Sequence, residues 1–335
     1  MRALITGANG FLGSHLVDVL LESGWQVGAM VRESSNLRFL EGKEIALVFG
    51  DVSLSPSELA PRIEGADVVF HLAGVTKALD RSTFFRINQK GTDNLLRACL
   101  QAKAPRFVLA SSLGASGPSP TAEPITERDQ REPVTAYGLS KLAAEHEARR
   151  YRDRLAISVL RPGAIYGPRD LELLPAFQAV QRGLAPTMGV VPRMINMIHV
   201  RDAARAFMLA GTEERAVGET FLVATHSLTQ PELYAHIKTI LGKRALLPVP
   251  IPTAVVRLAA LASSLACQIT RKPRIFCHGN VRRFVEGHWA VDGTKARELL
   301  GLEPEFDLGP GLADTVAWYR NQGLLGVRPR HLTLE

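Results

Sequence analysis

The chain has 335 residues, of which 46% are hydrophobic and 22% charged, which is the composition of a globular rather than a disordered protein. This length exceeds what one core usually fills, so we expect a large domain with a smaller lobe. The formal net charge is +7, but no Lys/Arg block is interleaved with aromatic residues, which argues against a nucleic-acid partner.

In the first half of the chain, short apolar runs alternate with segments of helical periodicity. Strands are predicted at residues 3–6, 26–31, 46–49, 68–72, 107–111 and 157–161. One helix is predicted to begin at the capping box Ser55-Pro56-Ser57-Glu58, and long helices are predicted at 82–101 and 136–152. This alternation indicates βαβ units, and therefore a parallel sheet of the α/β class.

After about residue 165 helices predominate, and strands are expected to be short and rare. Helices are predicted near 172–182, 201–211, 229–241, 253–268, 292–300 and 310–320. The apolar stretch 251–269 is long enough for a membrane span, but Arg257 interrupts it. We expect an amphipathic or buried helix there, or a lid over a substrate, and no stable membrane span.

The three cysteines, Cys99, Cys267 and Cys277, are far apart and form no Cys-x-x-Cys pair. This pattern excludes a disulfide framework, and no His, Cys, Asp or Glu residues have the spacing of metal ligands. Free cysteines favour a reducing compartment, and a strand that begins at residue 2 leaves no room for a signal peptide. We therefore expect a cytoplasmic protein without a metal.

Three glycines, Gly7, Gly10 and Gly13, separate the first predicted strand from the first helix. A strand that turns tightly into a helix brings backbone N–H groups and a helix N-terminus to one point, which binds phosphate. Gly7 permits the turn, Gly10 lets a pyrophosphate approach, and Gly13 lets the helix pack closely on the sheet. This context favours a dinucleotide site over a purely structural turn.

A second constellation has the residue types of proton-transfer chemistry. Tyr137 and Lys141 are four residues apart on a predicted helix, and so lie on one face of it. A nearby ammonium favours the phenolate form of a tyrosine, which can then act as general acid or base. Ser111 and Ser112 end the predicted fifth strand, where parallel sheets bind ligands. Nucleophilic serine chemistry is disfavoured because no Gly-x-Ser-x-Gly elbow surrounds them.

Two histidines and one aspartate have simpler interpretations. His71 and His199 lie in apolar, strand-like runs, and we interpret both as core residues rather than ligands. Asp202 follows His199 by three residues and is interpreted as a residue that starts a helix or binds backbone.

Further motifs follow in order: FGDVS (49–53), VVFHLAG (68–74), INQKGTDNLLRAC (87–99), VLASSLGASGP (108–118), YGLSK (137–141), RPGAIYGP (161–168) and IHVRDAARA (198–206). Gly7, Gly10 and Gly13 have the spacing Gly-x-x-Gly-x-x-Gly. Together with these motifs, which run along nearly the whole chain, this spacing resembles the extended short-chain dehydrogenase/reductase family. The resemblance is to the NAD-dependent epimerase/dehydratase superfamily, and within it to the branch of dihydroflavonol reductases and 3β-hydroxysteroid dehydrogenases.

The resemblance implies an α/β fold, a Rossmann-type doubly wound parallel sheet with a smaller, mostly helical C-terminal lobe. Residues 1–167 plus about 193–225 would form the NAD(P)-binding domain. Residues of about 168–192 plus 226–335 would form the substrate-binding lobe. The family also implies a homodimer, in which the helices at 82–101 and 136–152 pair across a two-fold axis.

The resemblance implies the site residues as well. Ser112, rather than Ser111, matches the catalytic serine, beside Tyr137 and Lys141. The residues expected to bind the cofactor are Gly7, Asn9, Gly10, Phe11, Leu12, Gly13, Arg32, Asp51, Val52, Leu72, Ala73, Asn88, Tyr137, Lys141, Pro162 and Ile165.

The end of the second predicted strand bears on the choice of cofactor. An acid there would bind the adenine ribose of NAD, whereas a basic residue would accommodate the 2′-phosphate of NADP. By resemblance Val31 stands at the acid's position, and Arg32 follows it. A guanidinium suits a phosphate, so we expect NADP, although Glu33 leaves NAD open.

Two departures from the family pattern bear on the substrate. Ala164 stands where nucleotide-sugar enzymes typically carry Asn, and Ile195-Asn196 where they often carry Arg-Asp. We therefore expect an NAD(P)-dependent oxidoreductase that transfers hydride between nicotinamide and a carbonyl or secondary alcohol of an apolar substrate. The alternatives are a nucleotide-sugar epimerase or dehydratase with tightly bound NAD, and a non-catalytic NADP-binding protein. The intact Ser112, Tyr137 and Lys141 argue against the last.

Overall fold

The computed structural model describes residues 1–189, 191–274, 276, 279 and 281–326. Cys277 and the last part of the predicted substrate lobe, residues 327–335, lie outside the described residues. The other two cysteines, Cys99 and Cys267, are buried and free.

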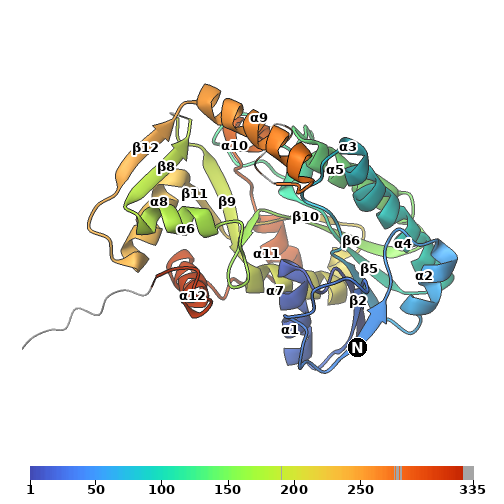
Figure 1. Cartoon of the computed structure of the whole chain (residues 1–335). Coiled ribbons are helices and arrows are strands. Elements are labelled where there is room, and N and C mark those ends of the chain that lie inside the picture. The colour runs from blue at the N-terminus through green and yellow to red at the C-terminus, as the bar shows by residue number, and fades with distance from the viewer. Residues whose placement is uncertain (190, 275, 277–278, 280, 327–335) are drawn as a thin grey trace, which may run out of the picture.

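A seven-stranded sheet forms the centre of the larger half of the molecule (Figure 1). Its strands, in spatial order, are β10 (Thr220–Val223), β6 (Ala156–Pro162), β5 (Arg106–Ala110), β4 (Val68–His71), β1 (Arg2–Thr6), β2 (Gln26–Val31) and β3 (Ile45–Phe49). All neighbouring pairs are parallel. The six strands predicted in the first half are all present, so the predicted doubly wound fold is confirmed.

Helices cover both faces of this sheet (Figure 1). On one face α1 (Phe11–Glu22), α7 (Val200–Thr212) and α11 (Thr294–Leu300) share a core that includes Phe70. On the other face α2 (Pro56–Ile63), α4 (Gly91–Gln101) and α5 (Ala136–Arg149) share a core that includes Phe107.

The predicted capping box at the start of α2 is present. The Ser55 hydroxyl accepts the backbone N–H of Glu58, and the Glu58 carboxylate accepts that of Ser55. The helix buries Leu59 and Ile63 against the sheet. The same reciprocal cap opens α8 (Gln230–Leu241), from Thr229 to Glu232.

The helix predicted at 82–101 is not a single α-helix. It consists of α3 (Arg81–Phe84), the π-helical η1 (Phe85–Lys90) and α4. The wider π-helical segment contains Asn88, whose buried side chain is hydrogen-bonded to groups outside the helix. Such π segments are frequent at functional sites.

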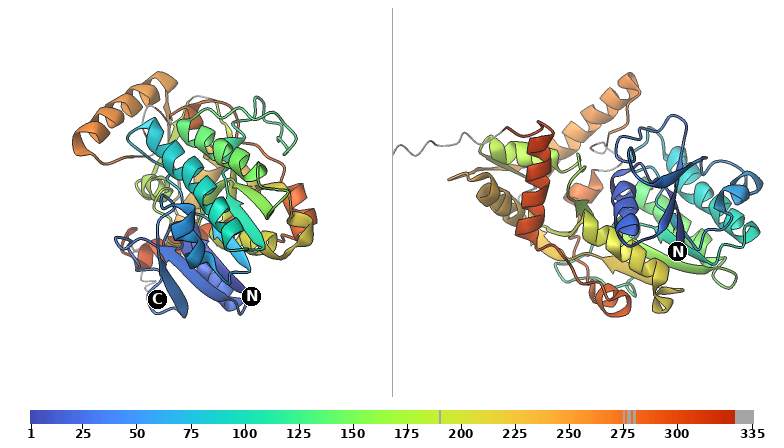
Figure 2. Two further views of the ribbon diagram at one scale, coloured as in Figure 1. Left: turned by 90° about the vertical axis from the view of Figure 1, so that its right-hand side faces the viewer. Right: turned by 90° about the horizontal axis from the view of Figure 1, so that it is seen from below.

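The second half of the chain holds more strands than the sequence predicts. A three-stranded sheet contains β11 (His226–Thr229), β9 (Met194–His199) and β7 (Ala164–Tyr166), and β12 (Leu247–Ile251) pairs with β8 (Leu184–Met188). Helices α6 (Leu174–Gln181), α8 and α12 (Leu308–Asn321) pack around a separate core. The 18-residue α9 (Thr253–Thr270) and the short α10 (Arg282–Val285) complete this half, and Figure 2 shows α9 standing out from the rest of the molecule.

The two histidines are both buried, as interpreted, but their partners differ. The ring of His71 lies within hydrogen-bond distance of the Thr6 and Thr92 hydroxyls, and burial lowers its pKa to about 3. His199 has no hydrogen-bond partner among the described residues, although its Nε2 lies 3.4 Å from the Asp314 carboxylate. Asp202 accepts two backbone N–H groups, from Glu305 and Phe306, so its interpretation as a backbone-binding residue is confirmed.

Candidate active site

The glycine turn between β1 and α1 has the geometry of a phosphate-binding loop. Gly7 has φ +71°, and a Cβ there would lie 2.8 Å from the backbone nitrogen of Ala73. A Cβ on Gly13 would lie 2.1 Å from the Gly7 carbonyl oxygen, so only glycine permits this close packing. Gly10 is the N-cap of α1, and no side chain within the described part of the chain forms a hydrogen bond at this cap. The first backbone N–H groups of α1 are therefore available to bind an anion such as a pyrophosphate.

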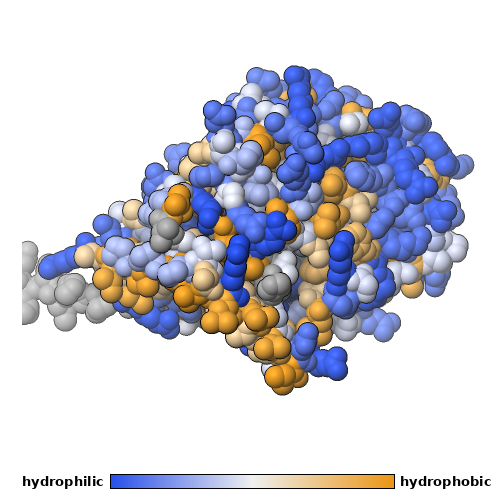
Figure 3. All heavy atoms as spheres, turned by 90° about the horizontal axis from the view of Figure 1, so that it is seen from above, coloured by the Kyte–Doolittle hydropathy of each residue, from blue (hydrophilic) through white to orange (hydrophobic). Residues whose placement is uncertain are grey.

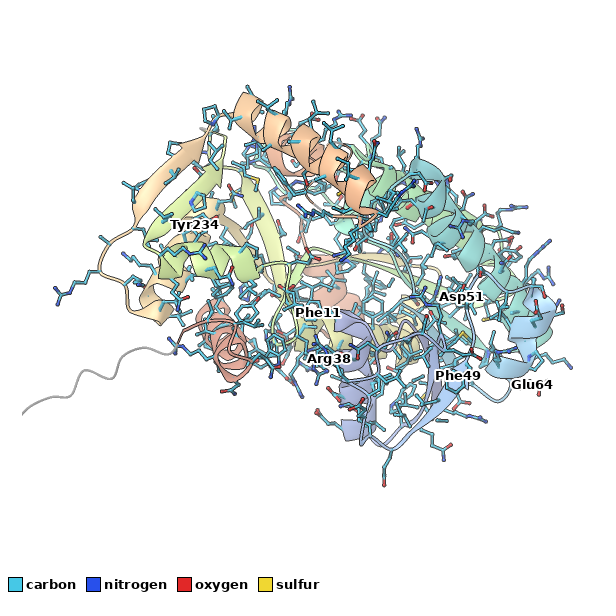
Figure 4. The ribbon with its side chains drawn as sticks, viewed as in Figure 1. Phe11, Arg38, Phe49, Asp51, Glu64 and Tyr234 are labelled. Atoms are coloured by element: carbon cyan, nitrogen blue, oxygen red, sulfur yellow. The ribbon has the colours of Figure 1, made fainter. Side chains whose placement is uncertain are left out.

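A groove of about 230 Å³ runs from this turn along the carboxyl ends of the strands. Eight residues expected to bind the cofactor line it, namely Gly7, Asn9, Gly10, Arg32, Asp51, Val52, Leu72 and Ala73. Phe11, at the start of α1, and Asp51, after β3, are labelled in Figure 4. The other lining residues, which are not in the expected cofactor-binding set, are Thr6, Met30, Val31, Ser35, Gly50, Gly74, Val75 and Ile87. The other expected cofactor residues, Phe11, Leu12, Gly13, Asn88, Tyr137, Lys141, Pro162 and Ile165, are not part of this lining.

One end of the groove carries both a cation and an anion. The Nε of Arg32 lies 3.9 Å from the carboxylate of Asp51, and the Arg32 side chain is 67% exposed. The Ser35 hydroxyl lies 3.1 Å from the Arg32 backbone nitrogen and lines the same groove. Burial acts to raise the pKa of Asp51, but hydrogen bonds from Ser53 and the Arg32 charge outweigh it, so the pKa is lowered.

Asn88 lies behind the groove. Its Oδ1 accepts the Val75 N–H at 2.8 Å, and its Nδ2 donates to the Val75 carbonyl and to the Ser140 hydroxyl. The side-chain amide of Asn88 therefore links the loop after β4, through Val75, to α5, through Ser140. This geometry makes Asn88 a residue that positions the groove wall.

Lys141 is a buried residue of α5, beside the groove. Its ammonium donates to the Ala110 carbonyl at 2.8 Å. A Cβ on Gly74, which lines the groove, would lie 3.1 Å from the same ammonium. Burial lowers the pKa of Lys141 to about 8, and the Glu145 charge opposes that effect. A desolvated ammonium beside a ligand groove is typical of a functional lysine.

A second cavity, of about 160 Å³, lies beside the first turn of α5. Its lining residues are Ser112, Leu113, Gly114, Thr135, Tyr137, Pro162, Gly163, Ala164, Ile195, Asn196 and Trp289. A Cβ on Gly114 would lie 3.4 Å from the Ser112 hydroxyl and 3.6 Å from the Tyr137 ring, so both side chains adjoin the same glycine. The cavity thus joins Ser112 and Tyr137, and Lys141 follows one helical turn after Tyr137.

The two neighbouring serines have different partners. Ser111 is buried, and its hydroxyl donates to Glu145. Glu145 also pairs with Arg161 through two hydrogen bonds, of 2.8 and 2.6 Å, and both side chains are at most 3% exposed. The Ser112 hydroxyl lies in the cavity and accepts the Gly114 N–H. Ser111 is therefore held in a structural network, whereas Ser112 borders the cavity.

Among the residues that the structure describes, the cavity lining carries no charged side chain. Ala164 and Ile195 contribute apolar surface, and the Asn196 amide accepts the Val291 N–H and donates to the Val291 carbonyl. Trp289 reaches the cavity from a segment more than 90 residues after β9's start. No sequence pattern near Trp289 indicated this position.

A glycine turn for pyrophosphate, a groove along a doubly wound sheet and a tyrosine-lysine pair beside it define an enzyme that uses a nicotinamide dinucleotide. The sequence profile of the NAD dependent epimerase/dehydratase family matches residues 3–224. The chain belongs to this family, and with it to the extended short-chain dehydrogenases/reductases.

Relatives of the chain include both reductases and epimerases. A ceramide reductase of Caulobacter vibrioides is 34% identical over 325 residues, which cover 96% of this chain and 95% of that protein. A putative dihydroflavonol 4-reductase of Synechocystis is 31% identical over 333 residues, covering 95% and 94%. The structure of a UDP-glucose 4-epimerase from Thermotoga maritima with UDP-glucose has a TM-score of 0.78 at 25% identity, covering 96% of this chain and 99% of that one.

Proposed function

We propose that the protein is an NADP-dependent oxidoreductase that interconverts a ketone and a secondary alcohol on an apolar substrate. The observation that carries this proposal is the uncharged cavity that Ser112 and Tyr137 share. A diphosphate would leave its charges unpaired in such a lining, which disfavours a nucleotide sugar. The names of the ceramide and dihydroflavonol reductases, whose substrates carry apolar groups, support the same choice.

In the proposed reaction, the bound nicotinamide supplies or accepts the hydride. Tyr137 gives its phenolic proton to the substrate oxygen during reduction and takes a proton from it during oxidation. The Ser112 hydroxyl donates a hydrogen bond to that oxygen and so orients it. The Lys141 ammonium favours the phenolate of Tyr137 by its charge, and its place against Gly74 suits it to bind the nicotinamide ribose.

Arg32 supports NADP as the cofactor. Its guanidinium is largely exposed and lines the groove together with Ser35, so it is available to a phosphate. A 2′-phosphate there would meet two donors, the Arg32 guanidinium and the Ser35 hydroxyl. The Arg32 charge also offsets the repulsion between the phosphate and the Asp51 carboxylate. The assignment of residues 1–167 and about 193–225 to the cofactor domain follows from the same proposal.

We also propose that the protein is a cytoplasmic homodimer, paired through the helices that the sequence places at 82–101 and 136–152. Sedimentation velocity at micromolar concentration tests the assembly. A single monomeric species across that range would refute it.

The reaction is tested with NADPH deuterated at the transferable position and a series of aliphatic ketones of increasing chain length. Deuterium should appear on the carbinol carbon of the product. If the cavity binds the chain, kcat/KM should rise about three- to fourfold per added methylene until the cavity is filled. An epimerase would instead carry tightly bound NAD, convert a UDP-sugar and consume no added NADPH.

The role of Tyr137 is tested by Tyr137→Phe, which keeps the ring and removes the proton. Turnover should fall by about 10²–10⁴-fold, while NADPH affinity and thermal stability remain close to those of the wild type. Full activity of this variant on a confirmed substrate would refute the proposed proton transfer.

A further inference from the structure

The outer face of α9 is an apolar stripe that no described residue covers. Its exposed large side chains are Val255, Leu258, Leu261, Leu265 and Ile269, which are between 47% and 83% exposed. Their spacing of three and four residues places them on one side of the helix. We call these five residues the α9 ridge.

The opposite side of α9 is packed against the protein. Val256 and Ala260 share a small core with Val281 and Val285, and Cys267 is also buried. By length and composition α9 is the one helix among the described residues that could cross a membrane, with a mean hydropathy of 1.4 over its 18 residues. A helix with one side fixed on its own protein and Arg257 in its first turns lies on a surface rather than across a bilayer.

Figure 3 shows hydrophobic residues gathered along an edge of the molecule in the view from above, and in Figure 2 α9 projects from the body. An exposed ridge of this kind costs solubility unless a partner covers it. The charge of the surrounding chain indicates which partner.

The chain around α9 is strongly basic. Residues 233–285 contain nine Lys and Arg and no Asp or Glu. The remainder of the chain has 31 basic and 33 acidic residues, so this one segment accounts for the whole positive net charge. Arg271, Lys272 and Arg274 are exposed directly after the helix. On the helix itself the Arg257 side chain is 58% exposed, and its guanidinium lies 3.7 Å from the carboxylate of Glu286, the acid that follows this segment.

We propose that α9 is a membrane-docking helix, which lays its ridge into one leaflet of a bilayer while the flanking cations bind anionic lipid headgroups. An apolar stripe bordered by Lys and Arg is the pattern of helices that lie in the membrane interface. A second copy of this chain fits less well, because two α9 surfaces would bring together the exposed cations of each copy on and directly after the helix, Arg257, Arg271, Lys272 and Arg274. The proposal stands independently of the reaction at Tyr137.

Co-sedimentation with vesicles tests the proposal on the full chain. The protein should bind vesicles of 70% phosphatidylcholine and 30% phosphatidylglycerol, bind pure phosphatidylcholine at least tenfold more weakly, and detach at 0.5 M NaCl. The triple variant Leu258→Ser, Leu265→Ser, Ile269→Ser should lower the affinity for anionic vesicles at least tenfold. Leu47→Ser, a leucine-to-serine change at a 43% exposed position on β3, far from α9 in the sequence, should have no effect.

A second variant tests how much the cations after α9 contribute to vesicle binding. Arg271→Gln, Lys272→Gln, Arg274→Gln should weaken binding to the anionic vesicles by about a hundredfold at low salt, and little in pure phosphatidylcholine. Because all substituted residues are exposed, an unchanged thermal midpoint will show that the variants fold. Failure of the wild type to bind anionic vesicles, or equal binding by the ridge variant, would overturn the proposal. A concentration-dependent dimer that the ridge variant dissociates, without vesicle binding, would show instead that α9 contacts a second copy.

Discussion

Replacing Lys141 by methionine should stabilise the protein in the absence of cofactor while it impairs turnover. Burial lowers the pKa of Lys141 from its usual value of 10.5 to about 8, a difference that corresponds to about 3 kcal/mol. This is the free energy that the folded chain loses by holding a desolvated ammonium at pH 7. Methionine has a similar length and no charge, but it leaves the Ala110 carbonyl without its 2.8 Å hydrogen bond, at a cost of about 1 kcal/mol. The net expected gain is about 2 kcal/mol.

The difference in stability between the wild type and Lys141→Met should depend on pH. Below about pH 8 the lysine is charged in both the folded and the unfolded chain, and the full penalty applies. Between pH 8 and 10.5 the unfolded chain holds a proton that the folded chain has released, so the wild type gains stability as the pH rises. The methionine variant has no such group. The difference in stability between the two proteins should therefore shrink by about 2 kcal/mol from pH 7 to pH 9.5.

Guanidinium unfolding at the two pH values measures this difference, and other titrating groups cancel between the two proteins. Lys90→Met is the control, because that lysine is 59% exposed and its ion pair is with Asp93, three residues later; its effect should stay within about 0.5 kcal/mol. The reasoning is refuted if Lys141→Met destabilises the protein at pH 7, or if its effect is the same at both pH values.

Three further predictions concern the cofactor groove and the serines. Arg32→Ala should weaken NADPH binding by roughly 10- to 100-fold and leave NADH binding nearly unchanged; equal losses in calorimetry would remove the case for NADP. Gly13→Ala should destabilise the protein by about 2 kcal/mol or more and abolish cofactor binding, because its Cβ would meet the Gly7 carbonyl at 2.1 Å, whereas Gly309→Ala has open space around it and should be neutral. Ser112→Ala should lower turnover with little change in stability, and Ser111→Ala should cost about 1 kcal/mol of stability with turnover retained; the reverse pattern in unfolding and steady-state assays would exchange their roles.

The first half of the fold was predictable because its signals are local. Each strand of the central sheet is a short apolar run, and each helix that follows shows its own periodicity or cap, as at Ser55. The glycine turn was equally readable, since the steric demand at Gly7 and Gly13 is expressed in the residue type itself.

The second half was less predictable because its strands depend on distant partners. β7 has three residues, and β12 contains Pro248 and Pro250, which sequence patterns assign to loops. β12 forms only because it pairs with β8, more than 50 residues earlier in the chain. Trp289 enters the cavity through a backbone hydrogen bond with Met194, a contact that no local pattern reveals.

Glu145 is the site residue that sequence reasoning missed although a signal was present. Tyr137, Lys141 and Glu145 follow one another at intervals of four, so they share one face of α5. The spacing that paired the tyrosine with the lysine therefore extends by one more turn, to a buried carboxylate. Its charge opposes the effect of burial on the Lys141 pKa, and its oxygens hold Ser111 and Arg161. The Glu145 carboxylate therefore favours the charged form of Lys141. It also binds the Ser111 hydroxyl, whereas the Ser112 hydroxyl borders the cavity. The four-residue interval thus connects the two groups for which we propose a role in the reaction, Tyr137 and Lys141, with the buried carboxylate of Glu145.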